Sequence, residues 1–532
     1  MKTGRGGEGI VAAALALALA LVVGQAILHR DHWVDDAFIG FRYAANLAAG
    51  AGPVWHPGDP PVEGITNLGW VLVLAGLAGF GSLPVVAKGL GLAALAGTLV
   101  GAVVLHRRLV PEAGVVERAA LPLLLAAQPE LVYFSLAGME TGLTALVTVL
   151  AGLLALAHEA WPRTVGAGLG LVAVALFLLR PEMALLPIFL LLIAGLGRDR
   201  RGLATFLLVA VVGLSLISAW RWATFGVALP NTFAAKAPGT VADLAGRALL
   251  APLGGLVNLP PPFGLGLVGL IFGGWRLTRV PGRGRDLVVA FVATGVGFAV
   301  YARPDWTEMG RYFAPFVPLA TLLLLRGVAV LAGRVSTRQG RVVTAAVALL
   351  LVGQGFVRHA RHLSGAALGE QPGFVLVAES LVVPAQRFAL QMPREATVAC
   401  RRIGVLGFSS QARVFDFAFG LTEPEVARQL RKAQIAFFDN ARTPALAELW
   451  RSKAPEFLVE DWTRLERWLV DGESARHFRI HGLPYEVIDS APIAEGRERW
   501  VLARRIVGEA PEQDDWRAAA ERAGPRDPLR PN

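Results

Sequence analysis

The chain has 532 residues, of which 54% are hydrophobic and only 17% charged, whereas soluble proteins carry about 25% charged residues to cover their surface. Its formal net charge of +10 fits the basic cytoplasmic loops of a membrane protein and gives no reason to expect a nucleic-acid partner. Its single cysteine, Cys400, excludes an intrachain disulfide framework and a cysteine-based zinc cluster. Together with the apolar, charge-poor composition, this excludes a soluble enzyme, a secreted mini-domain and a disordered scaffold.

The first apolar run, Ile10–Leu28, follows Lys2 and Arg5 and has two interpretations. A signal peptide would have a shorter apolar region and a clearer small-residue cleavage pattern than Gly24 and Ala26 provide. The length of the run favours an uncleaved spanning helix.

Further apolar runs long enough to cross a bilayer follow along the chain, which predicts a polytopic α-helical membrane protein with about 11 spans, the first run included. The later runs are Pro84–Leu105, Ala119–Phe134, Thr141–Ala157, Val165–Leu179, Met183–Gly197, Leu203–Ala219, Ala251–Trp275, Asp286–Ala302, Phe313–Leu331 and Val342–Phe356.

The basic residues orient these spans. With the N-terminus in the cytoplasm, every arginine cluster between spans falls inside, apart from the lone Arg180, as the positive-inside rule requires. The alternation works only if Leu68–Phe80 is not a span, and this run is shorter than the roughly 20 residues needed to cross. We interpret it as a re-entrant or interfacial helix on the outer face.

The character of the sequence changes after Arg358. Residues 1–358 form the predicted transmembrane domain, and residues 359–507 lack any run of span length and have the size of an independent domain. Short apolar stretches predict strands at Thr397–Ala399, Arg413–Phe415 and Phe457–Val459, with a turn at Gly404–Gly407 and a helix at Pro424–Lys432, hence a soluble, extracytoplasmic α/β domain. The charged, proline-containing tail 508–532 is predicted to be disordered.

The first outer loop, residues 30–67, is rich in acidic and aromatic side chains. Phe38, Phe41, Ala45 and Ala48 recur at helical spacing, which predicts an amphipathic helix on the outer surface, ended by Gly50. The helix begins at the pair Asp35–Asp36, whose side chains point about 100° apart. One carboxylate can cap the amino terminus of this helix, while the other can face a cleft.

Nine segments, in order through most of the chain, form a recognisable set: Asp35–Leu47, Gly50–Asp59, Val62–Trp70, Ser135–Thr141, Arg180–Glu182, Leu229–Lys236, Gly310–Pro315, Ile403–Phe408 and Phe415–Leu421. The first three resemble the first-loop signature of the GT-C glycosyltransferases, and the others continue the likeness. The likeness is greatest to bacterial polyprenyl-phosphate-sugar enzymes that include the mycobacterial terminal arabinofuranosyltransferases. Departures from their pattern are His56, Asp59, Ile65 and the pair Arg401–Arg402.

The resemblance implies transfer of a sugar from a polyprenyl-phosphate donor to a cell-envelope acceptor at the outer face of the cytoplasmic membrane. A base must take the proton of the acceptor hydroxyl, and cations must hold the departing phosphate. Asp35 and Asp36 are the candidate catalytic residues. Asp36 is preferred as the base because Asp35 is better placed to cap the helix.

Other candidate substrate-binding residues each have a structural alternative. Glu63 binds acceptor hydroxyls or is a turn residue beside Gly64, and Glu140 lines the sugar pocket or complements a helix dipole. Arg180 and Glu182 contact substrate or pair with neighbouring helices. The cations Lys236 and Arg311, with Asn231 adding hydrogen bonds, hold the donor phosphate or interact with lipid headgroups.

The spacing of His, Asp and Glu predicts no protein-only metal site and no required cofactor, although the Asp pair could share Mg²⁺ or Ca²⁺ with the donor phosphate. The expected partners are the donor lipid, a glycan, lipid or protein acceptor, and the bilayer. A transporter or flippase of lipid-linked glycans is the alternative function, but it would carry charges near mid-bilayer, whereas the ionisable residues here cluster at the outer ends of spans. A non-catalytic assembly factor would not need the acidic loop.

Overall fold

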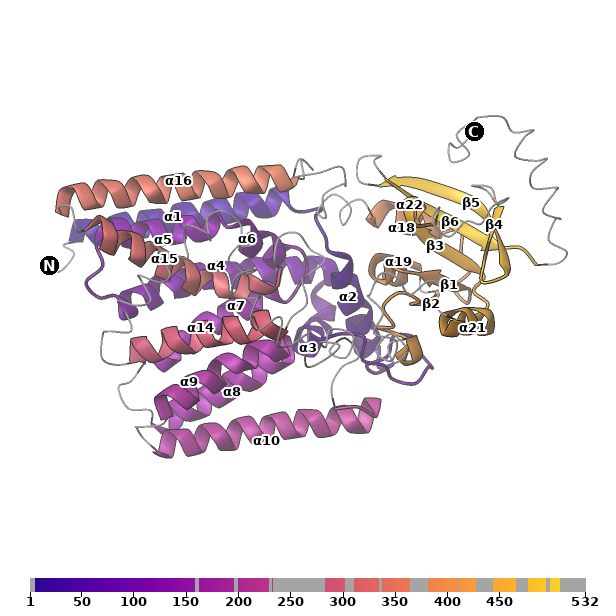
Figure 1. The fold of residues 1–532 in the computed structure, drawn as a ribbon, viewed down its shortest axis with the longest axis horizontal. Coiled ribbons are helices and arrows are strands. Elements are labelled where there is room, and N and C mark those ends of the chain that lie inside the picture. Colours follow the sequence, from indigo (N-terminus) through magenta and orange to yellow (C-terminus); the bar gives the residue numbers. More distant parts are fainter. Residues whose placement is uncertain are drawn as a thin grey trace. The chain divides into compact units, whose positions relative to one another are not determined.

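The chain forms two compact units in a computed structural model (Figure 1). The first takes the described residues within Met1–His32, Thr66–Ala228 and Lys236–Arg361; the second takes those within Trp33–Ile65, Leu229–Ala235 and His362–Asn532. Most of the predicted first outer loop is therefore grouped with C-terminal residues. The structure describes residues 5–157, 162–195, 200–228, 232, 283–301, 311–333, 337–363, 381–410, 412–426, 444–465, 477–493 and 498–507.

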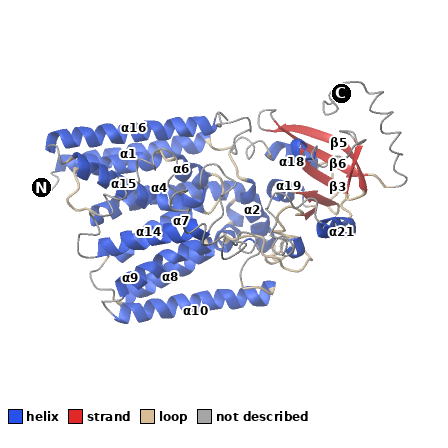
Figure 2. Cartoon of the chain, in the orientation of Figure 1, coloured by secondary structure: helices blue, strands red, loops and turns tan. Residues whose placement is uncertain are grey.

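The described elements of the first unit are all helical (Figure 2). The α-helices are α1 (Arg5–Leu28), α3 (Leu68–Gly76), α4 (Leu83–Leu109), α5 (Val115–Ala126), α6 (Pro129–Leu136), α7 (Thr141–Ala155), α8 (Arg163–Leu179), α9 (Leu185–Gly195), α10 (Arg200–Phe225), α14 (Arg283–Tyr301), α15 (Val317–Ala332) and α16 (Thr337–Leu363). Three 3-10 helices accompany them: η1 (Ala78–Phe80), η2 (Pro181–Ala184) and η3 (Arg311–Phe316).

Small residues let these helices approach closely. A Cβ atom on Gly91 of α4 would lie 1.9 Å from the carbonyl oxygen of Ser135 in α6, and one on Gly166 of α8 would lie 2.1 Å from that of Gly202 in α10. Dense packing of this kind replaces the hydrophobic effect between helices surrounded by lipid. Large apolar side chains also face outward, such as Leu216 of α10, 66% exposed, as expected of a lipid-facing surface.

Five helices in the described part are long and apolar enough to cross a membrane, or six if α5 and α6, bent by 48° at their junction, form one span. This confirms the prediction of a multi-pass helical membrane protein. Shorter apolar helices cover several other predicted spans, while Ala251–Trp275 lies outside the described residues. The figure of about 11 spans stays a prediction.

Two local features of the first unit bear on the predicted boundaries. The run Leu68–Phe80 forms the short helix α3 followed by η1, so it is helical but well below span length. Helix α16 continues to Leu363, beyond the predicted domain boundary at residue 358, because the charged residues that end the apolar run are still compatible with a helix.

The second unit contains a six-stranded sheet with the order β2-β1-β3-β6-β5-β4. Strands β2, β1 and β3 are parallel, and β6, β5 and β4 continue the sheet with antiparallel pairings. The strands are β1 (Thr397–Cys400), β2 (Arg413–Phe415), β3 (Phe457–Asp461), β4 (His477–Ile480), β5 (Leu483–Ile493) and β6 (Glu498–Arg505). The helices of this unit are α2 (Asp35–Ala48), α18 (Val382–Ala389), α19 (Ile403–Ser410), α21 (Pro444–Lys453) and α22 (Trp462–Leu465).

The three strands expected from sequence are present. The turn expected at Gly404–Gly407 is wrong, since this segment forms α19. The two glycines, three residues apart, share a helix face instead of breaking the chain. The expected helix at Pro424–Lys432 is described only as far as Val426.

The first-loop helix is confirmed as α2, and Gly50, with φ of +79°, follows its end. Its expected surface position is wrong, because Asp35 and the continuous stretch Ala37–Ala44 are buried. Phe38 and Phe41 pack against Phe408 of α19 with ring centroids 5.7 and 6.0 Å apart. Helix α2 is therefore a core element of the second unit.

Candidate active site

The carboxylate of Asp35 lies at the amino terminus of α19. Its oxygens accept hydrogen bonds from the backbone N–H of Gly404, at 3.1 Å, and of Val405, at 2.8 Å. A Cβ atom on Gly404 would meet the carbonyl oxygen of Asp35 at 1.9 Å, so only glycine permits this approach. No side-chain hydrogen bond caps the start of α2. The expectation that Asp35 caps its own helix is therefore wrong: it caps α19, whose unpaired amides and dipole favour an anion.

Burial raises the pKa of Asp35 to about 6, with the charge of Asp36 acting in the same direction. The two backbone amides oppose this shift, as does the positive charge of Arg402. Only 6% of Asp35 is exposed, whereas Asp36 is half-buried. The two neighbouring carboxylates thus lie in different environments, and Asp36 is the more accessible.

Arg42 joins α2 to the rest of the second unit. Its Nε donates to the carbonyl of Trp55 at 2.9 Å, and its Nη1 donates to that of Gly407 at 2.7 Å. Its Nη2 donates to the carbonyl of Ala412 at 3.2 Å and to Nδ1 of His56 at 3.0 Å, and the guanidinium lies 4.4 Å from the Trp55 ring centroid. Because all three nitrogens of its guanidinium donate to groups of the protein, we assign Arg42 a structural role and not substrate binding.

His56, one of the residues that depart from the GT-C pattern, also connects the first loop to the sheet. Burial lowers its pKa to about 4, so at neutral pH its Nδ1 can accept the Arg42 hydrogen bond while Nε2 faces the carbonyl of Val414 at 3.4 Å. Asp59, another departure, forms an ion pair with Arg413 of β2, with both carboxylate oxygens 2.7 Å from Nη2. Both residues attach the first loop to the sheet.

Glu63 lies in a buried segment without regular structure, with 2% exposure, and the structure assigns no turn at this position. The Tyr43 hydroxyl of α2 donates to the carbonyl of Val62 and accepts from the N–H of Gly64 at 3.1 Å. Burial raises the pKa of Tyr43, and the charge of Glu63 acts in the same direction. A Cβ atom on Gly64 would lie 2.7 Å from the carbonyl oxygen of Leu421. The structure thus places Glu63 beside Tyr43.

A separate polar network lies in the first unit. Glu140 accepts from Arg180 Nε at 3.0 Å and from the side-chain amide of Asn67 at 2.7 Å, and Arg180 Nη1 also donates to Glu182 at 2.9 Å. Glu140 and Arg180 are buried, while the Glu182 side chain is 17% exposed. Three expected site residues are therefore brought together as an ion-pair network, with Glu182 at its more exposed end.

The expected phosphate-binding group is only partly described. Arg311 begins η3 in the first unit and is 3% exposed. Asn231 and Lys236 lie outside the described residues.

Sequence reasoning missed Lys88, a cation within the apolar helix α4. Its ammonium donates to the carbonyls of His29 at 2.6 Å, His32 at 2.8 Å and Leu136 at 3.0 Å. It thereby joins the end of α1 to the end of α6. A lysine inside a span is the signal that could have revealed it, because such charges are costly unless used.

The described residues contain no group of three or more His, Cys, Asp or Glu side chains arranged to hold a metal ion. Both oxygens of Asp35 already face backbone amides, so a cation at the Asp pair would draw most of its ligands from the substrate and water. The donor set of the pair therefore does not fit a resident metal.

Comparison with solved structures identifies the architecture. The oligosaccharyltransferase of Archaeoglobus fulgidus matches with a TM-score of 0.53 and 12% identity over 85% of this chain and 69% of that chain. ArnT of Cupriavidus metallidurans matches with a TM-score of 0.51 and 15% identity over 94% of this chain and 99% of that chain. Both are GT-C glycosyltransferases. The chain shares the GT-C fold.

Three other comparisons add detail. The Archaeoglobus fulgidus enzyme AglB, solved with an inhibitory peptide and a dolichol-phosphate, matches with a TM-score of 0.52 and 14% identity, again over 85% of this chain and 69% of that chain. Residues 378–519 match a domain of unknown function (DUF8728). No curated protein matches the sequence. At these identities the likeness establishes the GT-C fold and leaves donor and acceptor to proposal.

Proposed function

We propose that this chain is a glycosyltransferase that moves a sugar from a polyprenyl-phosphate donor to a glycan or lipid acceptor of the cell envelope, with Asp36 as the general base. The GT-C fold supports this proposal, as does the dolichol-phosphate bound to AglB. In the proposed topology the N-terminus is cytoplasmic, and the first loop and the C-terminal domain (359–507) lie outside. An arabinofuranose donor rests on the sequence resemblance alone.

The assignment of Asp36, and not Asp35, as the base depends on the different environments of the two aspartates. Asp35 is committed to the amides of Gly404 and Val405, so it positions the first turn of α2. Asp36 follows it about 100° further around the helix and is half-buried. A base needs this combination of a fixed backbone and an accessible carboxylate.

In the proposed reaction the acceptor hydroxyl oxygen attacks the anomeric carbon of the donor sugar. Asp36 takes the hydroxyl proton as the new glycosidic bond forms. The bond between the anomeric carbon and the phosphate oxygen breaks, and the electron pair leaves with the polyprenyl phosphate. Because phosphate is a good leaving group, no second, protonated carboxylate is needed, unlike in glycoside hydrolysis.

The remaining candidate residues take binding roles in this proposal. Arg311, Lys236 and Asn231 hold the donor phosphate, since charge-assisted hydrogen bonds to phosphate oxygens are strong. Glu182, at the exposed end of the network with Arg180 and Glu140, binds sugar hydroxyls. Glu63, which lies beside Tyr43, binds hydroxyl groups of the acceptor.

The test uses the purified full-length chain, reconstituted with a panel of polyprenyl-phosphate sugars and a cell-envelope glycan fraction as acceptor. Asp36→Asn is expected to lower kcat by about 100-fold to 10,000-fold, the range for loss of a general base. Asp31→Asn is the matched control, because Asp31 is near in sequence and its side chain is 82% exposed.

Full activity of Asp36→Asn would overturn the assignment of the base. Absence of turnover with every donor, together with movement of labelled lipid across the bilayer, would favour the transporter. Protection of α2 from hydrogen exchange should be unchanged in Asp36→Asn, which separates lost chemistry from lost folding.

A further inference from the structure

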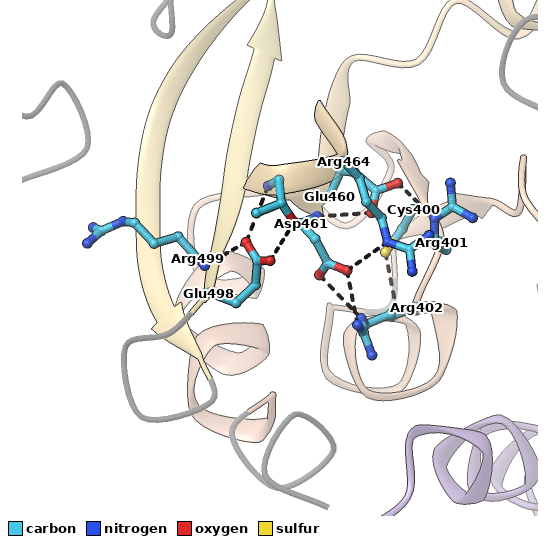
Figure 3. A network of polar contacts seen from close by, with 9 residues as sticks. Cys400, Arg401, Arg402, Glu460, Asp461, Arg464, Glu498 and Arg499 are labelled. Carbon is cyan, nitrogen blue, oxygen red and sulfur yellow. Dashed lines mark hydrogen bonds and ion pairs between the residues drawn. The ribbon is translucent and has the colours of Figure 1, made fainter. Parts of the chain in front are cut away.

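One buried and one partly buried ion pair lie at the carboxyl ends of the parallel strands β1 and β3 (Figure 3). Arg401 Nε lies 3.1 Å from Glu460 Oε2. Arg402 binds Asp461 through two contacts, Nε to Oδ1 at 3.3 Å and Nη2 to Oδ2 at 3.0 Å. The carboxyl ends of parallel strands are where α/β sheets place functional side chains.

Arg402 is also the residue immediately before α19, whose first amides bind Asp35. Burial acts against the charge of Arg402, but the carboxylates of Asp461 and Asp35 raise its pKa above the usual value. In the other direction, the charge of Arg402 lowers the pKa of Asp35. The first-loop aspartate and the ion pair of the sheet thus belong to one electrostatic cluster.

The charged and titratable groups around Asp35 and Arg402 come from three elements. Asp36 follows it on α2, Cys400 ends β1, and Asp461 with Glu460 ends β3. Burial raises the pKa of the Cys400 thiol, and the negative charges of Asp35 and Glu460 act in the same direction. Two further cations belong to the network, since Arg401 pairs with Glu460 and Arg464 lies 3.4 Å from Asp461. Arg402 is the cation whose charge acts on Asp35.

The Arg402–Asp461 ion pair loses hydration free energy on burial, so its presence calls for an explanation other than stability. Asp461 is 3% exposed and the Arg402 side chain 19%, and the cost of removing such charges from water often exceeds the Coulombic gain of the pair. Replacement by apolar residues is often neutral or stabilising in such cases, so stability alone does not explain the pair. The adjacent contact of Asp35 with the first amides of α19 suggests that the pair holds this part of the structure in position.

We propose that Arg402, held by Asp461, is a positioning residue for the aspartate pair. Its two contacts with Asp461 fix the residue that precedes α19, and with it the amides of Gly404 and Val405 that bind Asp35 and so hold the first turn of α2, which carries Asp36. This inference rests on the proposed function, in which Asp36 is the base.

Arg401 provides a matched comparison. It also belongs to an ion pair at the same sheet edge, a more deeply buried one, but its guanidinium pairs with Glu460 and lies 5.6 Å from the ring centroid of Phe417. Loss of Arg401 removes a similar interaction without removing the cation that precedes α19.

The experiment compares Arg402→Met, Arg402→Lys, Asp461→Asn and Arg401→Met in the full-length chain. Arg402→Met should lower kcat about 10-fold to 100-fold, the range for misplaced catalytic groups, with KM for the donor unchanged. Loss of the Arg402 charge raises the pKa of Asp35. Protonated Asp35 binds the two α19 amides less strongly and holds the first turn of α2 less firmly, so activity should be lost at a higher pH on the acidic limb of the pH–rate profile. Arg402→Lys keeps the charge and should restore the limb, while Arg401→Met should leave it in place.

Hydrogen exchange supplies a readout independent of catalysis. Arg402→Met and Asp461→Asn should both deprotect residues 403–410 and 35–48 while β3 and β6 stay protected. Unchanged protection and an unchanged acidic limb in Arg402→Met would overturn the proposal. Equal deprotection of all strands, as from any buried lesion, would also overturn it. If no donor is turned over, the proposed function fails, but hydrogen exchange still decides the positioning role.

Discussion

The guanidinium of Arg42 donates to the carbonyl of Gly407 across 2.7 Å, although 365 residues separate the two in the sequence. Gly407 lies on the face of α19 that packs against α2, and a Cβ atom there would come within 2.7 Å of the Trp55 ring and 3.1 Å of Arg42 Nη1. The loop that carries the candidate base is therefore built into the C-terminal sheet domain, so changes in that domain should act on the loop.

Arg42→Lys should destabilise the second unit by about 3 kcal/mol or more, since one ammonium cannot replace three nitrogens that donate in different directions and buried carbonyls lose their partners. Thermal unfolding of the purified chain, combined with hydrogen exchange of residues 35–48, measures this. Arg394→Lys, at an exposed position of the same unit, is the control. Equal stability of the two variants would contradict the role of Arg42.

Gly404→Ala should separate α2 from α19, because the added Cβ would overlap the Asp35 carbonyl oxygen at 1.9 Å. Backbone atoms cannot move aside as a flexible side chain would, so we expect a loss of about 1–3 kcal/mol and a large drop in any transferase activity. Ser409→Ala, at a half-buried position of the same helix, should behave as wild type. Unaltered hydrogen exchange of residues 35–48 in Gly404→Ala would show that the contact is dispensable.

These contacts mark the limit of prediction from sequence. Apolar runs located most of the helices, and short apolar stretches located β1, β2 and β3, because both signals are local. The partners of Asp35 lie 369 and 370 residues away, and no local pattern indicates such a pairing.

The same limit explains the errors around α19. Gly404 and Gly407 suggested a turn because glycine often ends regular structure, yet here their lack of side chains serves close packing. The acidic pair could be located from sequence, but which member is buried depends on the distant helix that covers it.

Glu140→Gln should destabilise the first unit more than Glu182→Gln. It removes the buried one of the two carboxylates that pair with Arg180, and because Glu182 still pairs with Arg180, we expect a loss of about 2–3 kcal/mol, below the roughly 3–5 kcal/mol of an uncompensated buried charge. The partly exposed Glu182 should contribute about 1 kcal/mol or less. Thermal unfolding of both variants measures the difference. The double variant Glu140→Gln, Arg180→Met should recover part of the loss, and strict additivity would argue against a coupled pair.

Asp416 should make stability depend on pH. Burial raises its pKa from 3.8 to about 6, against the hydrogen bonds from the amides of Phe419, Leu421 and Ala418. Because the folded-state pKa is the higher one, this group's contribution to the free energy of unfolding is fully present below pH 3.8 and is lost as the pH rises through about 6. Asp416→Asn should flatten this dependence by roughly 1–3 kcal/mol in unfolding measured by tryptophan fluorescence. An identical pH dependence in both proteins would contradict it.

The orientation of the first loop can be tested with single cysteines and no cysteine-free background, because Cys400 is buried and burial raises the pKa of its thiol. Ala49→Cys lies at the exposed end of α2, and Arg338→Cys at the exposed start of α16. In intact cells an impermeant maleimide should label the first and not the second, since the positive-inside rule puts Arg338 in the cytoplasm. Both should be labelled after permeabilisation. The reverse labelling pattern would put Asp36 on the cytoplasmic side, which would contradict the proposed reaction at the outer face of the membrane.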